Sequence, residues 1–199
     1  MLIIETPGSG KSHLIKYLIH EICSNYSVEY STVCSATAKL NGEYDFIDLK
    51  YVHTDWSDDF CEAIIKQQSS GKPAFLVLDD VIGNVQFNSK VFKKLAADYR
   101  HFNLRIIVVI QYLNSVIPPV VKNCIKAVTW FRQKQELTIK VIYSLFDLDF
   151  GNPSEFQDHM LALRKHQFVL HQPNETIEDR EEAYKVLKAP EIPEFSFVF

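Results

Sequence analysis

A glycine-rich segment close to the first residue has the residue types that bind phosphate. Residues 8–12 read Gly-Ser-Gly-Lys-Ser, between a short apolar segment at 2–4 and an apolar periodic segment. Glycines allow backbone N–H groups to turn inward around a phosphate, and the amino end of the following helix adds a partial positive charge. Lys11 would reach the β- and γ-phosphates of a nucleotide, and the Ser12 hydroxyl would bind Mg²⁺. The predicted nucleotide contacts of this P-loop (Walker A) segment are Pro7, Gly8, Ser9, Gly10, Lys11, Ser12 and His13.

One position departs from the P-loop pattern GxxxxGK[ST]. The first glycine of that pattern falls on Glu5. A carboxylate beside phosphates is unfavourable unless it points away from them, because like charges repel. Two alternatives to a working site therefore stay open: a glycine-rich helix cap without chemistry, and a degenerate site.

Two acidic residues follow the most apolar run in the chain. Residues 74–78 read Ala-Phe-Leu-Val-Leu and end on Asp79 and Asp80, which is the form of a Walker B strand. Such runs are typical of strands buried on both faces of a parallel sheet, whose carboxyl ends meet at one edge. Asp79 would then hold Mg²⁺, and Asp80 would orient or deprotonate the water that attacks the γ-phosphate. The alternative is a turn cap after a strand.

A glutamine ends the second buried run. Residues 104–110 predict a strand, and Gln111 follows it. If this strand lies between the P-loop strand and the Walker B strand, the Gln111 amide reaches the γ-phosphate and acts as a sensor. The alternative is a glutamine that only caps a loop.

The elements that position these residues alternate between strands and helices. This order predicts an α/β fold, a P-loop NTPase of the ASCE type with a mostly parallel central sheet flanked by helices. We expect an ATPase core over residues 1–145 and a C-terminal β-hairpin and helix extension over 146–199, packed on the same domain. The predicted strands are 2–4, 28–35, 74–78, 104–110, 127–131, 137–143 and 167–171. The predicted helices are 14–22, 57–69, 89–99, 154–164 and 176–188, with a loop at 36–50.

Composition excludes several classes of protein. The chain has 199 residues, 47% of them hydrophobic and 23% charged, which suits one ordinary domain and not a disordered chain. No apolar run approaches the roughly 18–20 residues of a membrane span, and the first residues lack the marks of a signal peptide. The four cysteines fit no metal-ligand spacing, so we expect reduced thiols.

The charge is unevenly distributed along the sequence. The net charge is −4, yet the stretch 90–140 holds ten Lys or Arg and two acidic residues. Such asymmetry indicates one electropositive surface on an acidic body. The alternative is that these residues are scattered over several faces after folding.

The ordered motifs resemble the FtsK–HerA superfamily of DNA-pumping ATPases, and within it the poxvirus-type genome-packaging ATPases of large DNA viruses and virophages. The likeness covers roughly residues 1–145. The segments that carry it are 8–12, Leu-Asp-Asp at 78–80, Arg-His at 100–101, Ile-Gln at 110–111 and Val-Lys-Asn at 121–123, with support from 36–41, 46–52 and 130–132.

The resemblance implies a ring-forming motor, a hexamer or pentamer, that hydrolyses ATP with Mg²⁺ and drives double-stranded DNA into a preformed capsid. It implies a location in the host cytoplasm or the virion, and capsid vertex proteins as further partners. An arginine from one subunit completes the neighbour's site in this family, and Arg100 matches that position best, with Arg105 as runner-up. The alternative for Arg100 is a helix-end cation.

Non-specific DNA contacts are expected at Lys122, Lys126, Arg132 and Lys134.

Two rival functions remain open. A small-molecule kinase would need a lid with arginines, which Arg100, Arg105 and Arg132 could supply, but it leaves Asp79, Asp80 and Gln111 unexplained. A nucleotide-binding assembly subunit without turnover would explain Glu5. The expected catalytic residues of the motor are Lys11, Asp80, Gln111 and Arg100, with Ser12 and Asp79 at the metal.

Overall fold

The centre of the molecule is one eight-stranded sheet with the order β3-β2-β4-β5-β1-β6-β7-β8. The computed structural model describes residues 1–6, 8–81, 84–111, 117–146, 150–173, 183–192 and 194–197. Every neighbouring pair from β3 to β6 is parallel, and β7 and β8 add two antiparallel pairings at the end of the sheet. The strands are β1 Leu2–Ile4, β2 Tyr30–Ser35, β3 Val52–His53, β4 Ala74–Asp79, β5 Leu104–Ile110, β6 Val128–Phe131, β7 Gln167–His171 and β8 Tyr184–Lys188.

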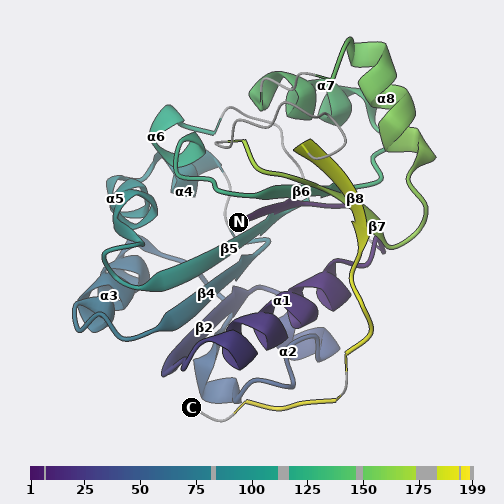
Figure 1. Ribbon diagram of the computed structural model, residues 1–199. Coiled ribbons are helices and arrows are strands. Elements are labelled where there is room, and N and C mark those ends of the chain that lie inside the picture. Colours follow the sequence, from purple (N-terminus) through teal and green to yellow (C-terminus); the bar gives the residue numbers. More distant parts are fainter. Residues whose placement is uncertain are drawn as a thin grey trace.

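Helices cover both faces of this sheet, which gives three layers (Figure 1). The helices are α1 Lys11–Asn25, α2 Ala38–Asn41, α3 Asp58–Gln68, α4 Asn84–Asn88, α5 Lys90–Asp98, α6 Pro119–Lys122, α7 Glu136–Leu145 and α8 Pro153–Ala162, with a 3₁₀ turn at Leu49–Tyr51. The fold class expected from the sequence is confirmed.

Neighbouring residues of each strand bury their side chains on opposite sides of the sheet, as the two-residue period of a strand requires. Ile3 packs into the core under α1 and α2, whereas Leu2 and Ile4 pack into the core under α3, α5, α7 and α8. All three side chains are at most 2% exposed. The short strand β1 is therefore held from both sides, and the P-loop that follows it starts from a rigid element.

Several helices begin at residues that satisfy their free N–H groups. Ser57 and Ser89 accept hydrogen bonds from Phe60 N and Phe92 N at the starts of α3 and α5. Asn152 accepts from two backbone N–H groups at the start of α8, where Pro153 occupies the first helical position. These signals explain why the expected helices 57–69, 89–99 and 154–164 lie close to the observed ones.

The expected strand at 137–143 is wrong, because this segment is helix α7. Its β-branched residues favoured a strand, but the buried positions Thr138, Ile139 and Ile142 have the spacing of one helix face. Lys140 also pairs with Glu136 one turn earlier, at 2.6 Å. Burial against the sheet thus outweighs the local β preference.

The expected helix at 176–188 is also wrong over its last five residues. Residues 184–188 form β8 and pair antiparallel with β7, while residues 174–182 lie outside the described residues. The charged side chains of this segment suggested a solvated helix. In the structure, Val186 and Leu187 are about 40% exposed on a sheet edge instead.

No helix in the described part of the chain is long and apolar enough to span a bilayer. All four cysteines are described, and each is a free thiol. Burial raises the pKa of the Cys34 and Cys61 thiols to about 12, so both stay protonated and unreactive at neutral pH.

Candidate nucleotide-binding site

A polar cavity of about 500 Å³ lies where the P-loop joins β1 to α1, at the carboxyl edge of the parallel strands. Its volume is in the range of small-molecule sites. The sheet order places β5 between β4 and β1, as the sensor prediction for Gln111 required. The cavity is lined by Glu5, Gly8, Gly10, Lys11, Ser12, His13, Thr37, Asn41, Glu43, Gln111, Lys165 and His166.

The P-loop backbone takes turns that require glycine. Gly8 has φ 77° and Gly10 has φ 109°, both in the left-handed region that other residues rarely adopt. Gly10 is the N-cap of α1, and among the described residues no side chain caps this helix start. The first N–H groups of α1 are therefore available to an anion. Pro7, which we expected among the nucleotide contacts, lies outside the described residues.

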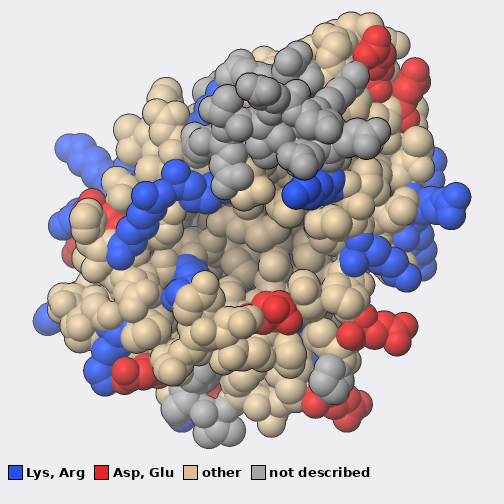
Figure 2. Space-filling model, viewed as in Figure 1, with Lys and Arg blue, Asp and Glu red and all other residues tan. Residues whose placement is uncertain are grey.

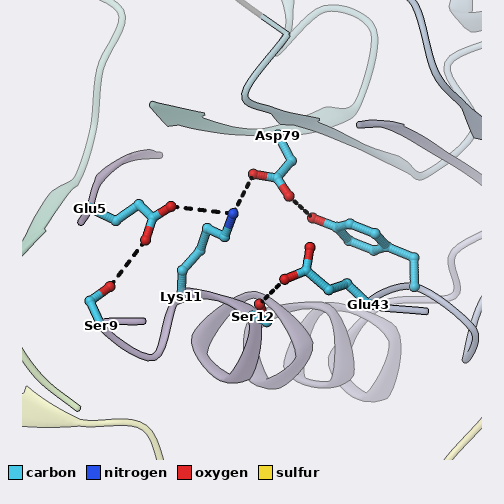
Figure 3. A network of polar contacts seen from close by, with 7 residues as sticks. Glu5, Ser9, Lys11, Ser12, Glu43 and Asp79 are labelled. Atoms are coloured by element: carbon cyan, nitrogen blue, oxygen red, sulfur yellow. Dashed lines mark hydrogen bonds and ion pairs between the residues drawn. The ribbon is translucent and has the colours of Figure 1, made fainter. Parts of the chain in front are cut away.

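Lys11 lies between two buried carboxylates (Figure 3). Its Nζ is 3.2 Å from Asp79 Oδ1 and 3.3 Å from Glu5 Oε1. Glu5 also accepts a hydrogen bond from the Ser9 hydroxyl at 3.1 Å. The Glu5 and Asp79 residues are each 1% exposed. The Walker A lysine and the Walker B aspartate predicted from sequence are thus in direct contact.

This arrangement shifts the pKa of both partners. Burial raises the pKa of Glu5, although the charge of Lys11 works in the opposite direction. Burial would lower the pKa of Lys11, but the charges of Asp79 and Glu5 outweigh it and raise that pKa. Lys11 is therefore a firmly protonated cation. The ionised form of Glu5 is destabilised, because its carboxylate is buried.

Glu43 and Tyr44 complete the network from the segment between α2 and β3. Glu43 accepts a hydrogen bond from the Ser12 hydroxyl at 2.6 Å, and Tyr44 donates one to Asp79 Oδ2 at 2.9 Å. Gly42, with φ 66°, ends α2 and turns the chain toward this network. The Asn-Gly turn at 41–42 was visible in the sequence, but nothing in the spacing showed that residues 43 and 44 meet the P-loop.

Asp80 and Gln111 lie side by side after β4 and β5. The Gln111 backbone N–H donates to the Asp80 carboxylate, and the Asp80 N–H donates to Val109 O at 3.1 Å. Asp80 has φ 60°, a left-handed conformation outside the strand. Burial and the charge of Asp79 raise the pKa of Asp80, which suits a group that takes a proton from water.

The donor set near Ser12 fits Mg²⁺. Hydroxyl and carboxylate oxygens of Ser12, Asp79 and Glu43 are the hard ligands that Mg²⁺ prefers. Among the described residues, no cluster of three His, Cys, Asp or Glu forms a ready metal cage. Mg²⁺ in nucleotide sites commonly binds through one or two protein groups and the substrate phosphates.

The two candidate arginine fingers lie away from this cavity. Arg100 is exposed in the turn between α5 and β5, at the amino edge of the sheet, and its Nε donates to Tyr99 OH at 3.1 Å. The Arg105 guanidinium lies 3.5 Å from the ring centroid of Tyr26. Neither reaches the P-loop of its own chain, so a role at a neighbour's site stays a prediction.

The basic residues expected to contact DNA divide between two edges of the sheet. Lys122 and Lys126 precede β6 at the amino edge, whereas Arg132 and Lys134 follow it at the carboxyl edge. The Arg132 carbonyl accepts a hydrogen bond from Thr6 beside the P-loop. Figure 2 shows Lys and Arg side chains at separate places on the visible face and no single basic patch. The four residues expected to contact DNA therefore do not lie together.

His13 is exposed at the start of α1. Its Nε2 lies 2.9 Å from the Pro190 carbonyl, so its ring meets the C-terminal segment even though the residue lines the cavity.

The fold of this chain is similar to that of several solved proteins. The genome packaging NTPase B204 of Sulfolobus turreted icosahedral virus 2, solved with AMPPCP, has a TM-score of 0.68 and 17% identity over 95% of this chain and 96% of its own. The conjugation coupling protein TcpA of pCW3 has a TM-score of 0.61 and 13% identity over 89% of this chain and 58% of its own. The cytoplasmic domain of the Thermomonospora curvata type VII secretion ATPase EccC has a TM-score of 0.61 and 14% identity over 92% of this chain and 26% of its own.

This chain shares the α/β fold of these ATPases. The likeness to B204 runs over nearly the full chain, so the shared fold includes the region after residue 145, for which the sequence analysis found no recognisable motif. Identities of 13–17% establish the fold and not the activity.

Two curated viral proteins are similar in sequence. The uncharacterized protein 075L of Invertebrate iridescent virus 6 is 29% identical over 152 residues, which is 72% of this chain and 58% of that protein. The uncharacterized protein 015R of Frog virus 3 is 27% identical over 144 residues, 67% of this chain and 44% of that protein. The chain thus spans about half the length of these relatives. No family profile matches it.

Proposed function

We propose that this chain is an ATPase that works in viral genome packaging. The observation that carries the proposal is the direct contact of Lys11 with the buried Asp79, beside a cavity that Lys11, Ser12 and Gln111 line. This set provides a phosphate cradle, a metal-side carboxylate and a sensor position at one edge of the sheet. Asp80, beside Gln111, supplies the candidate base.

Each residue has a distinct task in hydrolysis. Lys11 neutralises charge that develops on the transferred phosphoryl group, together with the N–H groups at the start of α1. Ser12 and Asp79 would hold Mg²⁺, which supplies further charge neutralisation and orients the phosphates when bound. Asp80 orients the attacking water and accepts its proton. Gln111 positions the reacting groups from β5.

Translocation of double-stranded DNA by a ring of subunits is the finer part of the proposal. Support comes from the fold shared with a genome packaging NTPase and from sequence similarity to two viral proteins. Arg100 would complete the site of a neighbouring subunit, and Arg132 and Lys134 would contribute to a non-specific contact with DNA phosphates. Capsid vertex proteins are the expected docking partners of the assembled ring.

Binding and chemistry are separated by two variants. Lys11→Ala removes the cation that holds the phosphates, so we expect it to lose ATP binding. Asp80→Asn keeps the left-handed backbone at φ 60°, which asparagine tolerates well. We expect it to bind ATP and to lose turnover by at least about 100-fold, the typical contribution of a general base. Calorimetry and phosphate release measure the two effects. Wild-type turnover in Asp80→Asn would remove Asp80 from the mechanism.

One observation favours a second candidate, a nucleotide-binding subunit without turnover. Glu5 occupies the position where the P-loop pattern has its first glycine. Its Oε1 forms an ion pair with Lys11 Nζ at 3.3 Å. ATP binding by the wild-type chain without phosphate release, under all conditions of assembly and DNA, would favour this second function.

A further inference from the structure

The C-terminal part of the chain forms one wall of the nucleotide cavity. Lys165 and His166 lie in the turn between α8 and β7, and both line the cavity together with the P-loop. In Figure 1 this turn descends beside the start of α1. None of the sequence motifs pointed to it.

The His166 ring packs against the P-loop backbone. A Cβ on Gly10 would lie 2.5 Å from His166 Nδ1 and 3.5 Å from His166 Cα. Only a glycine leaves room for the imidazole at this point. His166 itself has φ 65°, which turns the chain sharply before β7. The contact therefore depends on both residues: Gly10 provides the space, and the strained turn at His166 fills it.

The two sides of the P-loop are chemically different. Ser12 and Lys11 meet Glu43 and Asp79 on the side of β2 and β4. His166 meets Gly10 on the opposite side, because β7 follows β6 and β6 follows β1 in the sheet. If Asp79 and Ser12 mark the metal and γ-phosphate end, as the proposed function requires, a nucleotide along the loop extends its other end toward His166.

We propose that the turn formed by Lys165 and His166 is the subsite for the nucleoside end of the nucleotide. The ligand class is a nucleoside phosphate, whose sugar and base meet the His166 ring while its terminal phosphates stay with Lys11. An imidazole offers a flat apolar face and two ring nitrogens that can donate or accept, which suits a base or a ribose hydroxyl. This inference rests on the proposed nucleotide site and adds the C-terminal extension to it.

The test compares ligands that contain the nucleoside with one that lacks it. AMP, ADP and ATP contain it, and inorganic tripolyphosphate does not. Binding of all four is measured by calorimetry with Mg²⁺ for the wild-type chain, His166→Asn and His166→Gly. Asparagine and glycine both tolerate the left-handed backbone of residue 166, so neither variant strains the turn. His101→Asn, in the exposed turn at the opposite edge of the sheet, is the matched control.

We expect both His166 variants to weaken AMP, ADP and ATP by the same factor, about tenfold, and to leave tripolyphosphate unchanged. His101→Asn should bind all four ligands as the wild type does. Equal affinity of the His166 variants and the wild type for AMP would overturn the inference. An equal loss for tripolyphosphate would overturn it too, because the turn would then hold phosphates. A wild-type chain that binds none of the nucleotides would contradict the proposed function itself.

Discussion

Glu5 is the residue that sets this site apart from the ordinary P-loop pattern. Its carboxylate is buried, contacts Lys11 at 3.3 Å and accepts a hydrogen bond from Ser9. The phosphates of a bound nucleotide would approach the same ammonium group, so Glu5 competes with the ligand for Lys11. The ion pair with Asp79 remains if Glu5 loses its charge.

Glu5→Gln is expected to strengthen ATP binding. Glutamine has nearly the same shape but no negative charge, so phosphates meet less repulsion and a freer Lys11. We expect the affinity for ATP to increase about tenfold, because the substitution removes one negative charge close to the phosphates in a partly buried site. Calorimetry measures it, with Glu62→Gln on the exposed face of α3 as the control. Weaker binding by Glu5→Gln would show that the carboxylate supports the loop instead.

The same variant predicts a pH-dependent change in stability. The pKa of Glu5 is raised from its ordinary value of 4.5, so its contribution to stability is full below that pH and is lost as pH rises through the higher folded value. The raised value already includes the attraction of Lys11. The melting temperature of Glu5→Gln should therefore equal the wild type near pH 4 and exceed it increasingly toward neutral pH. Thermal unfolding across this range measures the difference, and an excess confined to acid pH would contradict it.

The sequence located Lys11, Ser12, Asp79, Asp80 and Gln111 because each follows directly from a local pattern or from the end of a buried strand. It could not locate Glu43, Tyr44 or His166. Glu43 and His166 reach the cavity, and Tyr44 reaches Asp79 behind it, through tertiary packing of segments 31 or more positions away from Ser12. Their side-chain types carry no spacing signal, so only the folded chain brings them to the P-loop.

Among the elements, buried strands and capped helices were predictable, and the region after β6 was not. Strand β4 is apolar up to Asp79, β5 is apolar except for Arg105, and α3, α5 and α8 carry capping residues at their starts. Segment 136–145 has strand-like composition but buries Ile139 and Ile142 on one helical face. The local β preference of this segment is outweighed by the packing of its helical face against the rest of the protein. That packing cannot be predicted from the sequence of the segment alone.

Helix α8 positions the turn that carries His166, so its anchor should matter for both folding and binding. Met160 is fully buried on this helix, whereas the adjacent Leu161 is 37% exposed. Met160→Ala should lower the free energy of unfolding by about 2–5 kcal/mol and weaken AMP binding. Leu161→Ala, the matched control, should change both much less. Urea unfolding and calorimetry test this, and equal effects of the two variants would contradict the assigned anchor.

At the scale of the whole molecule, the four basic residues expected to contact DNA lie at two different edges of the sheet. Lys122 and Lys126 lie at the amino edge of the sheet, and Arg132 and Lys134 lie at the carboxyl edge beside the P-loop. Each pair of these residues therefore offers only a small basic area to DNA. A ring would bring several copies of that area together around one duplex, so DNA binding should depend on assembly and fall steeply with salt.

A shared site between subunits predicts complementation. Arg100→Ala keeps its own P-loop, and Lys11→Ala keeps its own Arg100. Each variant alone should lose turnover by at least about 1,000-fold, which is the lower end of the contribution that an arginine finger makes to kcat. A mixture should recover part of the wild-type rate, because some interfaces combine an intact P-loop with an intact Arg100. The same mixture with Arg105→Ala in place of Arg100→Ala tests the runner-up. Full activity of Arg100→Ala at high protein concentration would exclude it as the finger.

The most direct test of the central claim is the rate of ATP hydrolysis per subunit across protein concentrations, with and without double-stranded DNA. Lys11→Ala is the blank. A ring motor with shared sites predicts a rate that rises with concentration, because subunits must meet, and rises further with DNA at low salt. A rate that is independent of both concentration and DNA would contradict the motor and favour a small-molecule kinase on the same fold.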